Sequence, residues 1–216
     1  MLGQSITKNS LILGGFAVVT AGVLAFTFSL TADKIAEEEK RAATRALSEI
    51  MPAHLYDNDL LSNTREIPLE QQQLLGLEGD EKIYIATLNG QTTAIIVPMI
   101  AHDGYSGAIK LIAGIQKNGQ ITGVRVLSHR ETPGLGDKID INKNDWITTF
   151  DGKSLTRPKS ERWAVKKDGG EFDQFTGATI TPRAVVNRVK QTLTYFKKHR
   201  VQFFSQNDGN SSGQEN

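Results

Sequence analysis

A segment in the last quarter of the chain combines the residue types that could hold an anionic ligand. Residues 175–182 read Phe-Thr-Gly-Ala-Thr-Ile-Thr-Pro. Thr181 predicts a helix N-cap and Pro182 the first helical residue, because proline lacks only an N–H group that is unpaired there in any case. Thr179 then lies just outside a helix amino terminus, where free N–H groups and a partial positive charge stabilise a bound phosphate.

Small and basic residues accompany this segment. Gly177 and Ala178 are small enough to let a ligand approach the backbone. Lys166, Lys167 and Arg183 lie nearby in the sequence and could make charge-assisted contacts with a dianion. An ordinary loop that caps an ordinary helix is the alternative, since capped helices are common.

A second candidate is the loop Arg130-Glu131-Thr132-Pro133-Gly134-Leu135-Gly136-Asp137. Its Pro-Gly pair favours a tight turn, and Gly136 frees the next corner of the backbone. Such a loop can lay N–H and C=O groups against a flat heteroaromatic edge. Glu131 has the chemistry of a general base, but no partner for that role is evident in the sequence, so no catalytic proton transfer is assigned to it. A loop with a purely structural role is the alternative.

A third candidate is the turn Asp103-Gly104-Tyr105-Ser106-Gly107, which precedes a predicted strand. Tyr105 could stack on a ligand or hydrogen-bond to it. The alternative is that its ring packs at a sheet edge, as tyrosines in such turns more often do.

The composition excludes several classes of protein. With no cysteine among 216 residues, the chain has no disulfide, thiolate metal site or iron–sulfur ligand. The four histidines form no HxH or HxxxH pair, so no metal site is predicted. A net charge of +1 without a basic stripe argues against nucleic acid as a partner. The chain also lacks GxGxxG, GxSxG and P-loop motifs, which disfavours dinucleotide folds, α/β-hydrolases and NTPases.

Two predicted hairpins form the centre of the domain that must position these loops. Asn89-Gly90 and Asn118-Gly119 each separate two β-rich runs. Asn-Gly is a strong hairpin signal because both positions of such a turn need positive φ. The sequence therefore predicts an antiparallel sheet with the strands Lys82–Leu88, Thr92–Val97, Lys110–Ile115 and Ile121–Leu127.

Helical patterns flank this sheet, so the predicted fold class is α+β. Apolar spacing predicts a helix over Asp33–Met51, ended by Pro52, and an amphipathic helix from Pro182 to about Arg200. A short helix is predicted near Asp145–Phe150. The polar tail from Gln206 is predicted to be disordered.

The amino-terminal region contains a candidate membrane span. Residues 10–32 read SLILGGFAVVTAGVLAFTFSLTA without a charged side chain, which is enough for the roughly 20 residues that cross a bilayer. A cleaved signal peptide is the alternative, but its apolar core would be only about 7–15 residues long. The flanking Lys and Arg residues would, if anything, favour an orientation with the large domain in the cytoplasm.

Beyond these patterns, the chain resembles a known family. The run Asp173-Gln174-Phe175-Thr176-Gly177-Ala178-Thr179 is similar to the D-x-x-[ST]-G-A-[ST] flavinylation motif of FMN-binding domains, and the 131–136 loop is similar to their flavin-ring loop. With the amino-terminal span, the 103–109 turn and residues 163–186, the chain resembles the G subunits of Rnf (Rsx) electron-transport complexes. The resemblance extends from Ser10 to about Lys197.

This resemblance implies a redox role. It implies FMN attached through its phosphate to Thr179 by a flavin transferase, and a single-pass protein of the bacterial inner membrane whose main domain lies in the periplasm. The chain would relay electrons, without being catalytic alone, in a complex that couples electron transfer between ferredoxin and NAD to ion translocation. Its partners would be the other subunits and the lipid bilayer. The implied cofactor-binding residues are Tyr105, Glu131, Thr132, Gly134, Leu135, Gly136, Lys166, Thr176, Gly177 and Ala178.

The resemblance also suggests a division of the chain and two rival interpretations. One rival is the C subunit of the sodium-translocating NADH:quinone reductase, which shares the anchor and both motifs. The other is a membrane-anchored module that binds a phosphate ligand without a covalent bond. The predicted segments are a cytoplasmic amino terminus (1–9), a transmembrane helix (10–32), a helical stalk and linker (33–80), a periplasmic FMN-binding domain (81–205) and a disordered tail (206–216).

Overall fold

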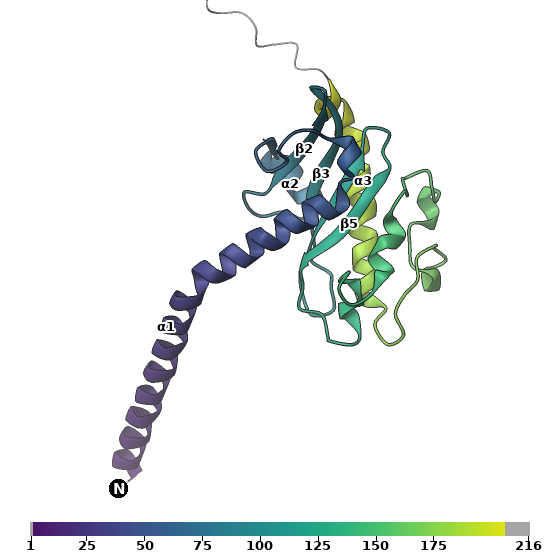
Figure 1. Ribbon diagram of the computed structural model, residues 1–216. Helices are drawn as coiled ribbons and strands as arrows, with labels where there is room; N and C mark the ends of the chain where they lie inside the picture. The colour runs from purple at the N-terminus through teal and green to yellow at the C-terminus, as the bar shows by residue number, and fades with distance from the viewer. Residues whose placement is uncertain (1, 206–216) are drawn as a thin grey trace, which may run out of the picture. The chain divides into compact units, whose positions relative to one another are not determined.

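The computed structural model describes residues 2–205, so the predicted disordered tail lies outside the described part of the chain. The chain divides into two units, residues 1–42 and residues 43–216. The first unit contains most of helix α1 (Leu2–Ile50), and the second contains its last turns and the rest of the fold (Figure 1). The described residues of the second unit include five 3-10 helices: η1 (Ala53–Leu55), η2 (Gly136–Ile139), η3 (Asp145–Phe150), η4 (Ser160–Arg162) and η5 (Lys166–Asp168).

Within α1, residues Lys8–Ile35 are long and apolar enough to cross a membrane. Three threonine hydroxyls on this stretch donate to backbone carbonyls four residues earlier, as Thr20 does to Phe16 at 2.8 Å. Such bonds satisfy the hydroxyl within the helix itself, which an apolar surrounding requires. The helix predicted over residues 33–51 is confirmed, because α1 continues to Ile50 and Pro52 follows.

A five-stranded antiparallel meander forms the sheet, with the strands in chain order from edge to edge. Both predicted hairpins are present, which confirms the α+β class. The pairing extends most of the strands beyond their predicted ends, because backbone pairing continues after the local sequence pattern fades. The strands are β1 (Thr64–Glu66), β2 (Lys82–Leu88), β3 (Gln91–Ala101), β4 (Ile109–Gln116) and β5 (Ile121–Ser128).

The two Asn-Gly hairpins differ in their turns. Asn89 and Gly90 both have positive φ, 52° and 75°, as a two-residue turn of the predicted kind requires. In the second hairpin only Gly119 has positive φ, 88°, and Gln116 donates its N–H to the carbonyl of Gln120 at 2.8 Å. This loop therefore has three residues, so the prediction of positive φ at both positions was wrong there. A three-residue loop needs a left-handed residue only at its last position.

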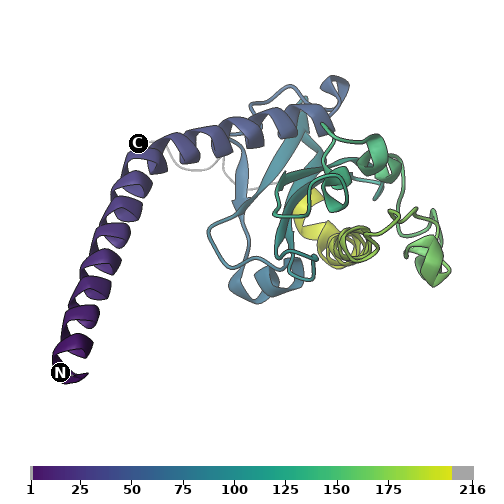
Figure 2. The same ribbon diagram turned by 90° about the horizontal axis from the view of Figure 1, so that it is seen from below.

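The sheet carries a separate apolar layer on each face. On β3, Ala94 and Ile96 face one layer, whereas Ile95, Val97 and Met99 face the other, because side chains alternate along a strand. The first layer is completed by the last turns of α1, chiefly Leu47 and Ile50. Figure 2 shows helix α3 (Ile180–Phe204) against the opposite face.

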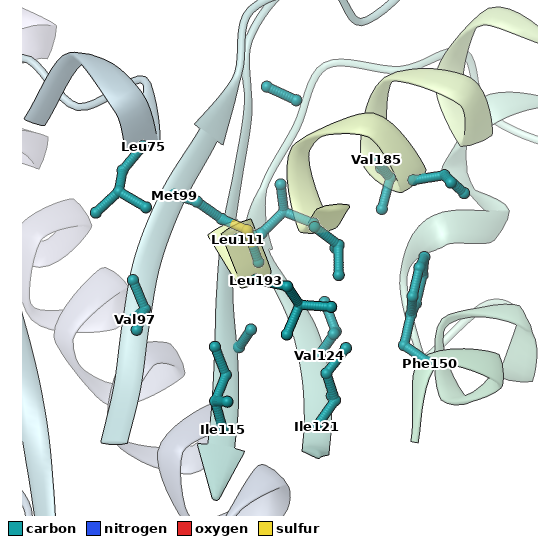
Figure 3. Packing of buried hydrophobic residues seen from close by; sticks show 14 of the residues in the cluster. Leu75, Val97, Met99, Leu111, Ile115, Ile121, Val124, Phe150, Val185 and Leu193 are labelled. Atoms are coloured by element: carbon teal, nitrogen blue, oxygen red, sulfur yellow. The ribbon is translucent and has the colours of Figure 1, made fainter. Parts of the chain in front are cut away.

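The larger core lies between the sheet and α3. In Figure 3, Leu193 of α3 lies among side chains from three neighbouring strands, including Met99, Leu111 and Val124, and Val185 of the same helix lies toward Phe150. Helix α2 (Leu69–Leu75) contributes Leu75 to the same cluster, and η3 contributes Phe150. This packing fixes α3 against the sheet and so sets the position of its amino terminus.

The structure also contains elements that the sequence did not predict. Strand β1 pairs with β2, α2 packs in the larger core, and the compact unit starts at Ala43. Much of the segment predicted as a stalk and linker up to residue 80 thus packs in the same unit as the sheet. The predicted short helix at Asp145–Phe150 is present as the 3-10 helix η3.

Candidate functional site

Glu131 lies at the centre of the candidate site, where its buried carboxylate joins three loops. The residue is only 4% exposed. Its Oε1 accepts a hydrogen bond from the backbone N–H of Ser106 at 2.9 Å, and its Oε2 accepts one from the hydroxyl of Thr181. The carboxylate therefore ties the 131–136 loop to the 103–107 turn and to the first turn of α3. The three sequence motifs are brought together by this one side chain.

Two glycines make room for the Glu131 carboxylate. A Cβ atom on Gly104 would lie 3.0 Å from Oε1 of Glu131. A Cβ atom on Gly136 would lie 2.9 Å from Oε2 of Glu131 and 2.9 Å from the Oγ1 of Thr181. Because real Cβ atoms hardly ever approach so closely, glycine at position 136 is needed for the Glu131–Thr181 hydrogen bond.

The segment before α3 forms a tight turn that packs on aromatic side chains. Ala178 donates its N–H to the carbonyl of Phe175 at 3.1 Å, and Gly177 has φ of 80°, as the third residue of a type II turn requires. The ring of Phe175 packs on Trp146 at 5.2 Å in an edge-to-face arrangement. Trp146 also donates its indole N–H to the carbonyl of Asp173 at 2.8 Å. These contacts leave Thr176 and Gly177 exposed at the tip of the turn.

The predicted roles of Thr181 and Pro182 at the start of α3 were wrong. The helix begins at Ile180, so Thr179 occupies the N-cap position and Thr181 lies within the first turn. Thr181 is fully buried and uses its hydroxyl to bind Glu131 rather than to cap the helix. The competing interaction is a tertiary hydrogen bond between residues 50 positions apart, which local sequence rules cannot anticipate.

Thr179 is the half-buried hydroxyl residue at the amino terminus of α3. Its side chain makes no capping hydrogen bond, while its carbonyl accepts the N–H of Arg183 at 3.3 Å. Because Pro182 in the first turn has no N–H, the backbone donors nearest to this helix end are the N–H groups of Ile180 and Thr181. The Thr179 hydroxyl thus has no hydrogen-bond partner among the described residues, and it lies at the positive end of the α3 dipole.

Two of the three basic residues singled out near the turn have acidic partners, whereas the exposed Lys167 forms no ion pair with a described residue. Arg183 binds both carboxylate oxygens of Asp168, at 2.6 and 2.9 Å. These hydrogen bonds lower the pKa of the Asp168 carboxyl and raise the pKa of the guanidinium. Lys166 pairs with Asp173 at 2.6 Å, and both side chains are more than half exposed. An anion at this end would therefore compete with exposed ion pairs, which are weak in water.

Three apolar side chains are exposed around the buried carboxylate of Glu131. Tyr105 is 69% exposed, Leu135 42% and Ile180 43%, and they come from the three loops that Glu131 joins. The loops approach closely, since a Cβ on Gly177 would lie 3.7 Å from the Leu135 side chain. An exposed apolar surface beside a free hydroxyl fits a group such as FMN, which has a flat aromatic ring system and a phosphate.

Sequence reasoning missed several residues that shape this site. Ser106, Trp146 and the partnership of Thr181 with Glu131 all depend on contacts across the fold. In the sequence, Trp146 belongs to the predicted short helix near Asp145–Phe150, and nothing there signals its hydrogen bond to Asp173, 27 positions away. Among the side chains that the structure describes, no group of three or more His, Asp or Glu residues is placed to hold a metal ion.

Replacing Gly136 with Ala should disturb the site more than replacing Gly134 with Ala. At Gly136 the added methyl meets Glu131 and Thr181, and such overpacking costs about 1–3 kcal/mol. At Gly134 the cost is limited to the left-handed backbone, φ 78°, because nothing lies within 4 Å of the new atom. Thermal unfolding of the two variants, with the yield of bound flavin, measures this. Equal unfolding temperatures and equal flavin yields would refute the role given to Gly136.

Comparison with known proteins defines the class. Residues 104–194 match the family model of the FMN-binding domain, and residues 1–50 match that of the RnfG N-terminal region. Relatives named as the G subunit of an ion-translocating oxidoreductase complex occur in Shewanella piezotolerans (46% identical, covering 94% of each chain) and Pseudomonas aeruginosa (48%, 91% of each). Another occurs in Vibrio atlanticus (48% identical, 94% of this chain and 96% of the relative).

The fold and the site thus define an FMN-binding domain that follows an amino-terminal apolar helix long enough to span a membrane. Within that class, the chain belongs to the family of G subunits of ion-translocating (Rnf) oxidoreductase complexes, because the identity extends over at least 91% of both chains. The resemblance inferred from the sequence is confirmed. The residues that Glu131 joins all lie within or directly before the matched FMN-binding region.

Proposed function

We propose that this chain relays electrons within an ion-translocating oxidoreductase complex, by means of an FMN bound covalently through its phosphate to Thr179. The observation that carries the proposal is the free hydroxyl of Thr179 at the amino terminus of α3, inside the region that matches the FMN-binding domain. Thr181, two residues away, is buried and engaged with Glu131. Thr179 is therefore the residue that combines a free hydroxyl with a position at the helix end.

Attachment requires a second enzyme, a flavin transferase that uses FAD. In this step the Thr179 hydroxyl loses its proton and its oxygen forms a new bond to the FMN phosphorus. The bond from that phosphorus to AMP breaks, and AMP leaves. The transferase can reach the Thr179 hydroxyl over the exposed tip of the turn, which is formed by Thr176 and Gly177 and followed by Ala178. The dipole of α3 would stabilise the remaining phosphate charge, with Lys166 as a nearby cation.

The FMN supplies the redox chemistry, because flavin accepts and donates electrons and the chain has no cysteine for this purpose. The protein's own residues position the ring. Thr132, Gly134, Leu135 and the exposed Tyr105 form the surface offered to it. Glu131 and Gly136, which the sequence predicted as cofactor-binding residues, are buried beneath this surface, so we assign them the task of holding the loop in shape.

A denaturing gel viewed under ultraviolet light tests the covalent bond. A fluorescent band at the mass of this chain is expected, since only a covalently attached flavin survives denaturation. A dark band from protein that is yellow before denaturation would overturn the covalent assignment and favour the module that binds its phosphate ligand without a bond. The match to the RnfG N-terminal region favours the Rnf family over the C subunit of the sodium-translocating NADH:quinone reductase. We infer from the family that the complex exchanges electrons between ferredoxin and NAD.

We further propose that the helix at Lys8–Ile35 lies in the bacterial inner membrane with the main domain in the periplasm. A large domain can be translocated largely regardless of its charge, so the Lys and Arg residues that flank the helix are compatible with this orientation. Alkaline phosphatase fused after Arg200 should be active, whereas a cytoplasmic reporter fused there should be inactive. The same reporters fused after Lys8 should behave in the opposite way. An active cytoplasmic reporter after Arg200 would show that the orientation is reversed.

A further inference from the structure

Helix α3 concentrates the positive charge of the molecule. It carries six Lys and Arg residues and no Asp or Glu, which leaves 19 Lys and Arg against 24 Asp and Glu in the rest of the chain. A near-neutral protein therefore contains one strongly basic element. The six cations of α3 are Arg183, Arg188, Lys190, Lys197, Lys198 and Arg200.

Most of these cations have no ion pair within the described part of the chain. Arg183 alone forms one, with Asp168 at 2.6 Å. Arg188 is partly buried between α2 and α3, where its Nη1 donates to the carbonyl of Leu74 at 3.2 Å. Burial lowers the pKa of the Arg188 guanidinium, and the charge of nearby Asp103 opposes this. Lys197 and Lys198 are exposed. Unpaired cations that gather on one helix create a field that attracts an acidic partner.

A hollow of about 580 Å³ lies between α2 and α3 within this basic region. Its floor includes Tyr195, which is 3% exposed and whose hydroxyl donates to Gln71 at 2.8 Å, and its side includes the exposed Leu74. The Nε of Arg188 is buried and has no hydrogen-bond partner among the described residues. The hollow is lined by Gln73, Leu74, Arg188, Lys190, Gln191, Thr194, Tyr195 and Lys198.

We propose that this hollow is the docking surface for an acidic segment of a neighbouring subunit. The choice of partner rests on the proposed membership of a complex, but not on the flavin. A concave surface that combines Arg188, Lys190 and Lys198 with the exposed Leu74 offers an acidic polypeptide both charged and apolar contacts. A lipid headgroup layer needs only cations and offers no side chain to fill the hollow.

The hollow is separate from the flavin site along α3. Residues 188–198 lie 8–18 positions after Ile180, which corresponds to roughly 12–27 Å along the helix axis. A partner bound there would hold the domain while leaving Thr179 and the loop at Glu131 uncovered. Docking and electron exchange can thus use different parts of one rigid helix.

The test is the double variant Lys190→Glu/Lys198→Glu in the full chain, produced with the other subunits and purified through a tag on this chain. The variant should recover roughly tenfold less of the neighbouring subunits at low salt, because reversing rim charges mainly slows association. The control is Lys143→Glu/Lys159→Glu, which makes the same change in net charge at exposed positions outside α3. Lys190→Arg/Lys198→Arg should behave as the unaltered chain.

Two further measurements keep the outcomes distinct. In-gel flavin fluorescence should be unchanged in every variant. If the chain carries no flavin and charge reversal on α3 still reduces subunit recovery, the flavin proposal is refuted and the docking surface is not. Equal recovery from the α3 variant and its control would overturn the docking surface. Anionic phospholipid vesicles without other proteins supply the second measurement. If charge reversal abolishes binding to these vesicles but leaves subunit recovery intact, the surface is for lipid and the proposal is wrong.

Discussion

Thr179→Val should give a folded, membrane-inserted protein that contains no covalent flavin. Valine preserves the shape of threonine but lacks the hydroxyl that forms the bond to phosphorus. The Thr179 side chain makes no capping hydrogen bond, so its loss should cost little stability. In-gel fluorescence and thermal unfolding of the same sample separate the two effects. Fluorescence that persists after denaturation would show that another residue bears the FMN.

Two neighbouring threonines serve as controls for this substitution. Thr176→Val, at the exposed tip of the turn, should retain flavin at least in part. Thr181→Val removes the hydroxyl that donates to Glu131, so it should lower stability by about 1–3 kcal/mol while leaving the acceptor in place. The expected pattern is therefore loss of flavin with normal stability at 179, and loss of stability with flavin retained at 181. The reverse pattern would exclude Thr179 as the acceptor.

Glu131→Ala should have the largest effect on the stability of the site. It leaves the Ser106 N–H and the Thr181 hydroxyl without their acceptor and opens a cavity beside Gly136. An unsatisfied buried group such as the Thr181 hydroxyl costs about 1–3 kcal/mol, whereas water can reach the exposed Ser106, so a total of about 2–4 kcal/mol with the cavity included is expected. For a unit of this size, the unfolding temperature should fall by on the order of 5–15 °C. The three loops would also lose their common anchor, so less flavin should be attached.

Glu131→Gln tests whether hydrogen bonding or charge matters at this position. The glutamine oxygen can accept from Ser106, and its NH₂ group can donate to the Thr181 hydroxyl, which can also act as an acceptor. The stability of Glu131→Gln should therefore lie between that of the unaltered chain and that of Glu131→Ala. Calorimetry of the three proteins in detergent measures this. If Gln and Ala are equally damaging, the ionised carboxylate itself is required, and the hydrogen-bond account is insufficient.

The parts of the fold that depend on local chemistry could be predicted from the sequence. The hairpin turns at Asn89-Gly90 and Asn118-Gly119 and the end of α1 before Pro52 are signalled by residues whose backbone preferences are strong. Strand β1 could not be predicted, because three residues hold no periodicity and the strand exists only through pairing with β2. Helix α2 is also short, and its place depends on Leu75 reaching the core.

The candidate site was predicted in its parts but not in its construction. The turn around Thr179 and the loop from Glu131 were recognisable as motifs, and Gly177 and Gly136 have backbone or packing reasons for being glycine. Their assembly depends on the hydrogen bonds that Glu131 accepts from residues 25 positions before it and 50 positions after it. One sequence contains no record of such distances, so Glu131 could not be distinguished there from a ligand-contacting residue.

Mass spectrometry of the tryptic peptide Asp168–Arg183 tests the central claim most directly. Cleavage after Lys167 and Arg183 places Thr176, Thr179 and Thr181 on one peptide, so fragmentation must locate the added mass among them. The proposed function predicts that the peptide carries one FMN bound through phosphate, with the fragment series placing it on Thr179. An unmodified peptide from protein that contains flavin, or an FMN located on Thr176 or Thr181, would contradict it.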